Sequence, residues 1–199
     1  MKKILCLLLS AIILYACNGI SYIAERQIQN TGLDFTKGKW LINEVDCPKA
    51  VYSKLYGTIN QEFDSYLNGR LFITNQVNSI LLPKKVVFNP TKDQIAQIKK
   101  GTLFDYFVNI KAVVIKDDLV TIDFSNHKNP NKAINRCSVI LEVYDLNLTE
   151  IIYSKEITGT VKINEENNQD INFSKNTNQI ILGCFKKIMK DVKKKSILK

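Results

Sequence analysis

Residues 136–161 read RCSVILEVYDLNLTEIIYSKEITGTV, and this stretch decides the fold class. Apolar and polar residues alternate from 136 to 146, the segment NLTE at 147–150 is typical of a turn, and a second β-rich run follows at 151–161. A period of two indicates a strand with one buried face. The stretch therefore predicts an antiparallel hairpin.

The residues before the hairpin extend it into a sheet. Runs at 104–115 and 119–124 are rich in β-branched and aromatic residues, and the turn-forming KDD at 116–118 separates them. Together with the hairpin they predict an antiparallel meander of four runs. Shorter strands are expected at 40–45 and 70–74.

Three further segments have a helical period. Apolar residues recur at every fourth position in 50–67, a second helix is expected at 92–100 after Thr91 as its N-cap, and 178–195 is amphipathic. The fold class is therefore α+β, with a mixed, mainly antiparallel sheet, two or three helices packed on it, and a closing C-terminal helix. We expect one such domain over residues 39–199.

The first seventeen residues have the pattern of an export signal. Lys2 and Lys3 precede an apolar run at 4–15, which is too short to span a bilayer as a helix. Leu14-Tyr15-Ala16-Cys17 resembles a bacterial lipobox, which implies that 1–16 are a signal peptide and that Cys17 is lipidated, with residues 17–38 as a tether. A plain secretory signal and an uncleaved amphipathic anchor are the alternatives.

The lipobox also implies a location. A lipidated Cys17 would anchor the chain in the cell envelope, and Asn18 stands where an aspartate would favour retention in the inner membrane. We therefore expect an outer-membrane lipoprotein that faces the periplasm. Removing 1–16 lowers the net charge from +9 to +7, because this segment holds two lysines and no acidic residue. Arginine occurs only three times, which argues against nucleic-acid recognition.

Neither the cysteines nor the single histidine forms a recognisable site. Lipidation of Cys17 would leave Cys47, Cys137 and Cys184, without CxxC or Cys/His spacing. Cys137 and Cys184 are both expected in one core, where a disulfide and two free thiols are the alternatives; free thiols are commoner at apolar positions. His127 lies in a polar loop. We expect no metal, no cofactor and no catalytic residues.

Several phrases resemble one group of bacterial envelope domains. They are YLNGRLF at 66–72, GTLFDYFV at 101–108, and the strand pair VILEVYD at 139–145 and IIYSKE at 151–156. With the element order they resemble the TolB N-terminal domain, the curli-secretion lipoprotein and the penicillin-binding-protein-activator lipoprotein. The resemblance implies a protein that binds other envelope components or assembles. The loops here are too short for the membrane hairpins of the curli channel.

The functional expectation is a non-catalytic binding or assembly accessory of the cell envelope, with an envelope protein as its partner. One alternative is a lipocalin-like carrier of a hydrophobic molecule, because GKW at 38–40 resembles the lipocalin G-x-W motif; a hydrolase is the weakest. The candidate contact surface for anionic headgroups or an acidic partner is on the last helix, where the alternative is a solvated face. Its residues are Lys186, Lys187, Lys190, Lys193 and Lys194.

Overall fold

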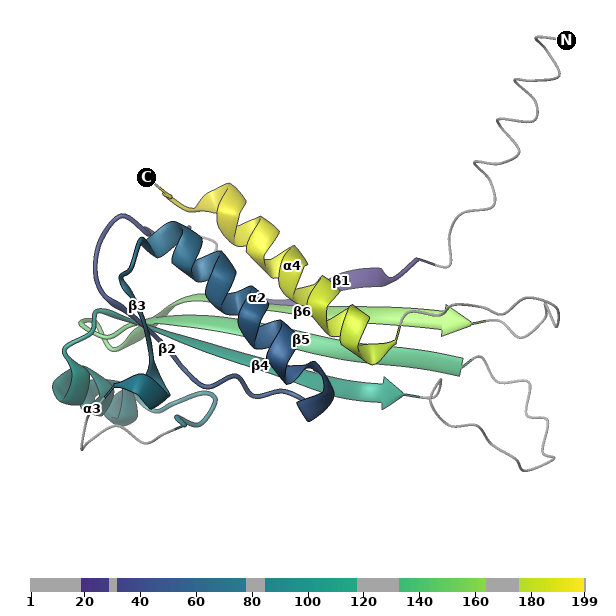
Figure 1. The fold of residues 1–199 in the computed structure, drawn as a ribbon, viewed down its shortest axis with the longest axis horizontal. Coiled ribbons are helices and arrows are strands. Elements are labelled where there is room, and N and C mark those ends of the chain that lie inside the picture. Colours follow the sequence, from purple (N-terminus) through teal and green to yellow (C-terminus); the bar gives the residue numbers. More distant parts are fainter. Residues whose placement is uncertain (1–18, 29–31, 78–84, 118–132, 164–175, 199) are drawn as a thin grey trace, which may run out of the picture.

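The computed structural model describes residues 19–28, 32–77, 85–117, 133–163 and 176–198. Within them six strands form one sheet in the order β1-β6-β5-β4-β2-β3 (Figure 1). β2 pairs in parallel with β3 and β4, and the other pairs are antiparallel, so the predicted mixed sheet is confirmed. The strands are β1 (Ser21–Ile28), β2 (Trp40–Ile42), β3 (Leu71–Ile73), β4 (Tyr106–Asp117), β5 (Ala133–Asp145) and β6 (Glu150–Ile163).

The hairpin predicted from 136–161 is the β5–β6 pair. Val139, Leu141 and Val143 of β5 are fully buried on one face of the sheet, as their alternation requires. The turn between the strands is stabilised by Asp145, whose carboxylate accepts hydrogen bonds from the backbone N–H groups of Asn147 (2.8 Å) and Leu148 (3.0 Å). This Asx turn fixes the register of the two strands.

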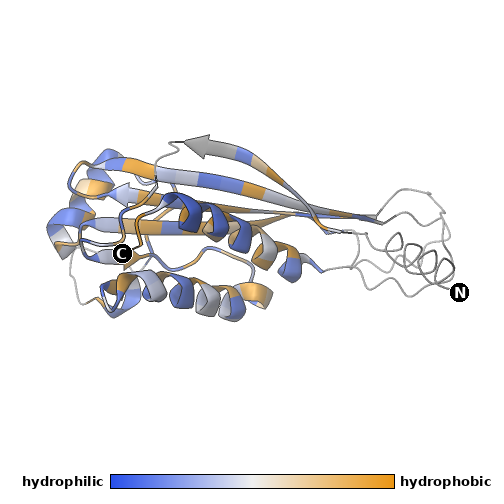
Figure 2. Ribbon diagram, turned by 90° about the horizontal axis from the view of Figure 1, so that it is seen from above, coloured by the Kyte–Doolittle hydropathy of each residue, from blue (hydrophilic) through white to orange (hydrophobic). Residues whose placement is uncertain are grey.

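Two long helices lie side by side on that buried face of the sheet (Figures 1 and 2). α2 (Lys49–Leu67) and α4 (Thr177–Lys195) are both amphipathic, and the predicted helical ranges are confirmed. The stripe of α2 is fully buried, and each such side chain stabilises the fold by about 1.5–3 kcal/mol. Its members are Val51, Leu55, Ile59, Phe63 and Leu67.

A smaller core lies on the other face, at one end of the sheet. Here α3 (Lys92–Thr102) packs Ile95 and Ile98 against Leu41, Phe107 and Tyr144. The predicted N-cap of α3 is confirmed: the side chain of Thr91 accepts a hydrogen bond from the backbone N–H of Gln94 at 3.3 Å, and the side chain of Gln94 accepts one from the backbone N–H of Thr91 at 2.8 Å.

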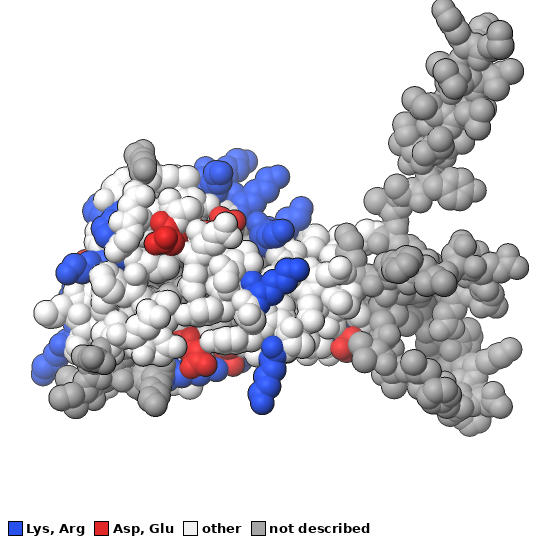
Figure 3. All heavy atoms as spheres, in the orientation of Figure 1, with Lys and Arg blue, Asp and Glu red and all other residues white. Residues whose placement is uncertain are grey.

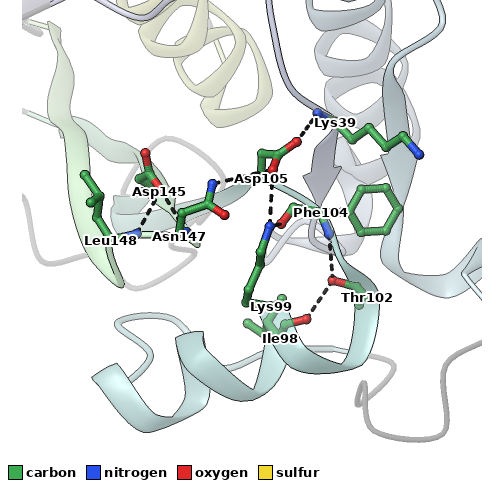
Figure 4. A network of polar contacts seen from close by, with 9 residues as sticks. All are labelled: Lys39, Ile98, Lys99, Thr102, Phe104, Asp105, Asp145, Asn147 and Leu148. Carbon is green, nitrogen blue, oxygen red and sulfur yellow. Dashed lines mark hydrogen bonds and ion pairs between the residues drawn. The ribbon is translucent and has the colours of Figure 1, made fainter.

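Asp105 joins three elements at this end of the sheet (Figure 4). Its carboxylate accepts hydrogen bonds from the backbone N–H of Lys39, just before β2, and from the amide of Asn147 in the β5–β6 turn. Lys99 of α3 pairs with it at 3.2 Å. The hydrogen bond from Lys39 is the main reason that the pKa of Asp105 is lowered. The Asp-Tyr pair of the sequence thus begins β4 and connects it with its neighbours.

The tether predicted for residues 17–38 is wrong for most of its length. Residues 21–28 form β1, which pairs antiparallel with β6. Leu33 and Phe35 are buried, and Phe35 stacks on Trp40 with ring centroids 4.8 Å apart. The backbone of Phe35 also donates a hydrogen bond to the carbonyl of Ile197 at 2.9 Å. This segment is ordered because it covers the outer edge of β6 and fills the core beside α4.

The run at 119–124 lies outside the described residues, so the described meander consists of β4, β5 and β6. The lipocalin-like alternative is wrong at the level of fold, because α2 occupies the position of a second barrel strand and β2 pairs in parallel with both its neighbours. Among the described helices none is long and apolar enough to cross a membrane.

Candidate functional site

All five predicted contact lysines lie on the outward side of α4. All five are exposed, whereas the opposite side of the helix is buried in the core through Ile181, Phe185, Ile188 and Val192. Figure 3 shows Lys and Arg side chains gathered over α4 on this face of the molecule. Within the described part of the chain no ion pair joins any of the five to a carboxylate.

An ion-pair cluster lies beside these lysines at the junction of α4 and β6. Asp191 of α4 pairs with Lys155 of β6 at 2.9 Å and with Lys195 at 3.0 Å. The hydroxyl of Tyr153 donates a third hydrogen bond to Asp191 at 3.2 Å. Burial alone would raise the pKa of Asp191, but the hydrogen bonds from Lys155 and Lys195 outweigh it and lower the pKa. The cluster therefore joins α4 to the sheet as a charged, satisfied network.

A second contact between the same elements is made by Tyr22 of β1. Its ring lies against Gly159 of β6 and Gly183 of α4. A Cβ at Gly183 would lie 1.8 Å from the Tyr22 hydroxyl, and a Cβ at Gly159 would lie 3.3 Å from its ring and 2.5 Å from Ile180. Both glycines are thus needed for β1, β6 and α4 to approach this closely. The burial of the Tyr22 ring raises the pKa of its hydroxyl.

Together these contacts form an open groove of about 340 Å³ between β1 and α4. One wall is largely apolar, with the Tyr22 ring, Ala24 and Ile157, and the other carries the cations of α4. Lys187 holds its ammonium group 5.4 Å from the centre of the Tyr22 ring, which is a cation–π distance. The complete lining is Tyr22, Ala24, Lys155, Ile157, Lys187, Lys190, Asp191 and Lys194.

The groove contains three of the five predicted lysines. It also contains three polar residues that were not predicted as site residues, namely Tyr22, Lys155 and Asp191. Lys187, Lys190 and Lys194 line it, whereas Lys186 belongs to a neighbouring depression with Ile20, Tyr22 and Leu182, and Lys193 lines neither. Tyr22 was missed because its segment was predicted to be a tether. Lys155 had a readable signal, since a lysine occupies a core-facing position between Tyr153 and Ile157 in the alternating strand; such a lysine needs a buried partner, here Asp191.

The three cysteines among the described residues are free thiols, and no disulfide joins them. Cys137 and Cys184 are fully buried and Cys47 is half-buried, and the structure gives all three as unpaired. The thiol of Cys184 faces the backbone carbonyl of Cys137 at 4.0 Å. Burial raises the pKa of Cys137 and of Cys184 to about 12 each, so both are inert, packed side chains. His127 and Cys17 lie outside the described residues. In the described ranges no His, Cys, Asp or Glu cluster of three or more could hold a metal.

A buried polar row on the other face of the sheet is structural. The amide of Asn43 donates hydrogen bonds to the carbonyl of Val86 (2.7 Å) and to Asn109 (2.9 Å), and it accepts one from the Val86 N–H at 3.1 Å. Next along the row, Tyr144 donates a hydrogen bond to the buried Glu142 at 2.6 Å. The asparagine pair holds the irregular segment at 85–88 against the sheet.

No protein family and no curated protein matches this sequence. Among solved structures, the fold is similar to the PelC dodecamer from Paraburkholderia phytofirmans, with 10% identity over 87% of this chain and 97% of that one and a TM-score of 0.44. It is also similar to a putative neuraminyllactose-binding hemagglutinin homolog from Helicobacter pylori, with 16% identity over 82% of this chain and 91% of that one and a TM-score of 0.39. A third similar structure is a lipoprotein from Neisseria meningitidis, with 9% identity over 66% of this chain and 88% of that one and a TM-score of 0.36.

Proposed function

We propose that this chain is a lipoprotein of the cell envelope that works by binding rather than by catalysis. Cys17 would carry the lipid and hold the domain at the outer membrane, facing the periplasm, where it serves as a binding or assembly accessory for another envelope component. The observation that carries the proposal is the closeness of the lipobox to the folded domain. Only residues 18–20 separate Cys17 from β1, and Tyr22 of β1 is packed between α4 and β6.

This arrangement supports a positional role. Two or three acyl chains at Cys17 would anchor the protein nearly permanently, since each buried methylene contributes about 0.8 kcal/mol. A direct connection from anchor to sheet would hold the groove and the lysines of α4 at a fixed place on the membrane. The groove offers cations and an aromatic face, which suit recognition of an anionic group.

Metabolic labelling with an alkyne-bearing fatty acid tests the anchor. We expect label on the wild-type chain and on a Cys47→Ser control, and none on Cys17→Ser, which should leave the membrane fraction. Unlabelled wild-type protein in the soluble fraction would contradict the proposal.

Crosslinking in intact envelopes tests the binding role. A photoreactive residue placed at Lys54 on α2 or at Lys92 on α3, both exposed and outside the groove, should give a defined crosslinked protein product at one of the two positions and not at the other. Equal products from both positions would argue against a specific protein partner.

A further inference from the structure

We infer that the groove between β1 and α4 binds the phosphate groups of anionic lipids in the membrane that holds the anchor. The inference rests on the proposed function for its choice of ligand, because it takes the membrane at Cys17 as the surface that the groove meets. It assigns the groove a ligand class, and it gives the domain a fixed orientation, with α4 against the bilayer.

The charges of the groove favour a monoanionic or dianionic group. Among the described residues that line the groove, Asp191 is the only acidic one, and it is already paired with Lys155 and Lys195. Lys187, Lys190 and Lys194 have no carboxylate partner among the described residues, so their positive charges remain available. Ammonium groups bind phosphate as point charges. Asp191 repels a phosphate only weakly, because Lys155 and Lys195 offset its negative charge.

The apolar wall fits the rest of a lipid rather than a free ion. The Tyr22 ring, Ala24 and Ile157 lie along one side of the groove, opposite the lysines. Tyrosine is favoured at membrane interfaces because its ring is apolar and its hydroxyl is polar. The lysine stems can likewise lie along apolar surface while the ammonium groups stay at the phosphates.

The length of the chain brings the groove to the headgroups. Cys17 precedes Ser21 by four residues, which can span at most about 14 Å. Tyr22, the next residue, already lines the groove. The headgroup layer is about 6 Å deep on each side of a bilayer. A lipidated Cys17 would therefore keep Tyr22 and the lysines of α4 within reach of that layer, where a cation attracts anionic lipids over a Debye length of about 8 Å.

Vesicle binding by an unlipidated chain tests the inference. The helices and strands of the structure all lie in residues 21–195, so the chain from residue 17 onward with Cys17→Ser contains every described element. Its binding to vesicles of pure phosphatidylcholine is compared with binding to vesicles that contain about 30% phosphatidylglycerol. We expect binding only to the anionic vesicles, and a decrease with added salt. Each lysine near the surface contributes about five-fold, so Lys187→Gln, Lys190→Gln and Lys194→Gln together should weaken binding about 100-fold.

A matched variant separates the groove from net charge. Lys39→Gln, Lys92→Gln and Lys100→Gln remove the same charge from exposed positions before β2 and on α3. This variant should bind within about three-fold of wild type. Tyr22→Phe should bind like wild type, whereas Tyr22→Ala should weaken binding if it remains folded by circular dichroism.

Two results would overturn the inference: equal loss in both lysine variants, or no preference of the wild-type chain for anionic vesicles. Because the protein in the vesicle assay carries no lipid, a negative result there says nothing against lipidation of Cys17. Conversely, absence of the fatty-acid label in cells does not change the result with vesicles.

Discussion

Replacing Gly183 with alanine should weaken the fold, although alanine favours helices more than glycine does. In the middle of α4 the change alone should gain about 1 kcal/mol of stability. The new Cβ, however, would lie 1.8 Å from the hydroxyl oxygen of Tyr22 and 2.8 Å from its Cζ, so the ring must leave its site. Overpacking of this kind costs about 1–3 kcal/mol, with a middle value of about 2 kcal/mol. Against the gain of about 1 kcal/mol, we expect a net loss of about 1 kcal/mol.

The measurement is urea denaturation followed by circular dichroism, on the chain from residue 17 onward with Cys17→Ser. Gly57→Ala in α2 is the matched control, because nothing lies within 4 Å of its added Cβ and that residue is exposed. The control should gain up to about 1 kcal/mol. In a Tyr22→Ala background, Gly183→Ala should lose its penalty, with a coupling energy of about 2 kcal/mol between the two sites.

Stabilisation by Gly183→Ala as large as that by Gly57→Ala would contradict a clash between α4 and Tyr22. A penalty at Gly183 that persisted in the Tyr22→Ala background would contradict it as well, because the cost would then have a cause other than the tyrosine ring.

Three further predictions concern the ion-pair cluster, the thiols and the core. Asp191→Asn should cost about 3 kcal/mol, because it leaves the nearly buried Lys155 without its partner. Since the pKa of Asp191 is lowered in the folded state, the ionised carboxylate contributes its full stabilisation above about pH 5 and loses it as the pH falls below about 4. In the variant, the free energy of unfolding should therefore depend less on pH in this range. In native protein at pH 8 a thiol reagent should modify Cys47 first, and Cys137 and Cys184 should react only on unfolding; early reaction of all three would argue against the packing of β5 on α4. Phe63→Ala should cost about 3–5 kcal/mol in urea denaturation, whereas Lys54→Ala, on the exposed side of the same helix, should change the free energy of unfolding by less than about 0.5 kcal/mol.

Periodicity was enough to predict the elements with one clear buried face. The four-residue repeat of α2 and the alternation of β5 each leave one solution for which side is buried. The N-cap at Thr91 was also predictable, since a threonine followed three residues later by Gln94 can form a capping box. These are local signals, and the structure confirms them.

The N-terminal segment was not predictable in the same way. Residues 21–28 carry a polar, mixed pattern that a strand can tolerate only at the edge of a sheet, and this strand forms because β6 offers an unpaired edge far along the chain. The groove was hidden for the same reason, since Tyr22 meets Gly159 and Gly183 only in the folded state. The lysines of α4 could be found from sequence, but the wall that faces them could not.

The place of β1 at the end of the sheet also determines how the domain would respond to mechanical load. A pull on the chain before Ser21 enters the protein through β1 and passes into β6 along their ladder of paired residues, from Ser21 and Thr160 to Ile28 and Ser154. Tyr22, wedged between α4 and β6, lies at the start of that ladder and resists the first step of peeling. Stretching the chain from its N-terminal end should therefore detach β1 as one unit before the meander opens.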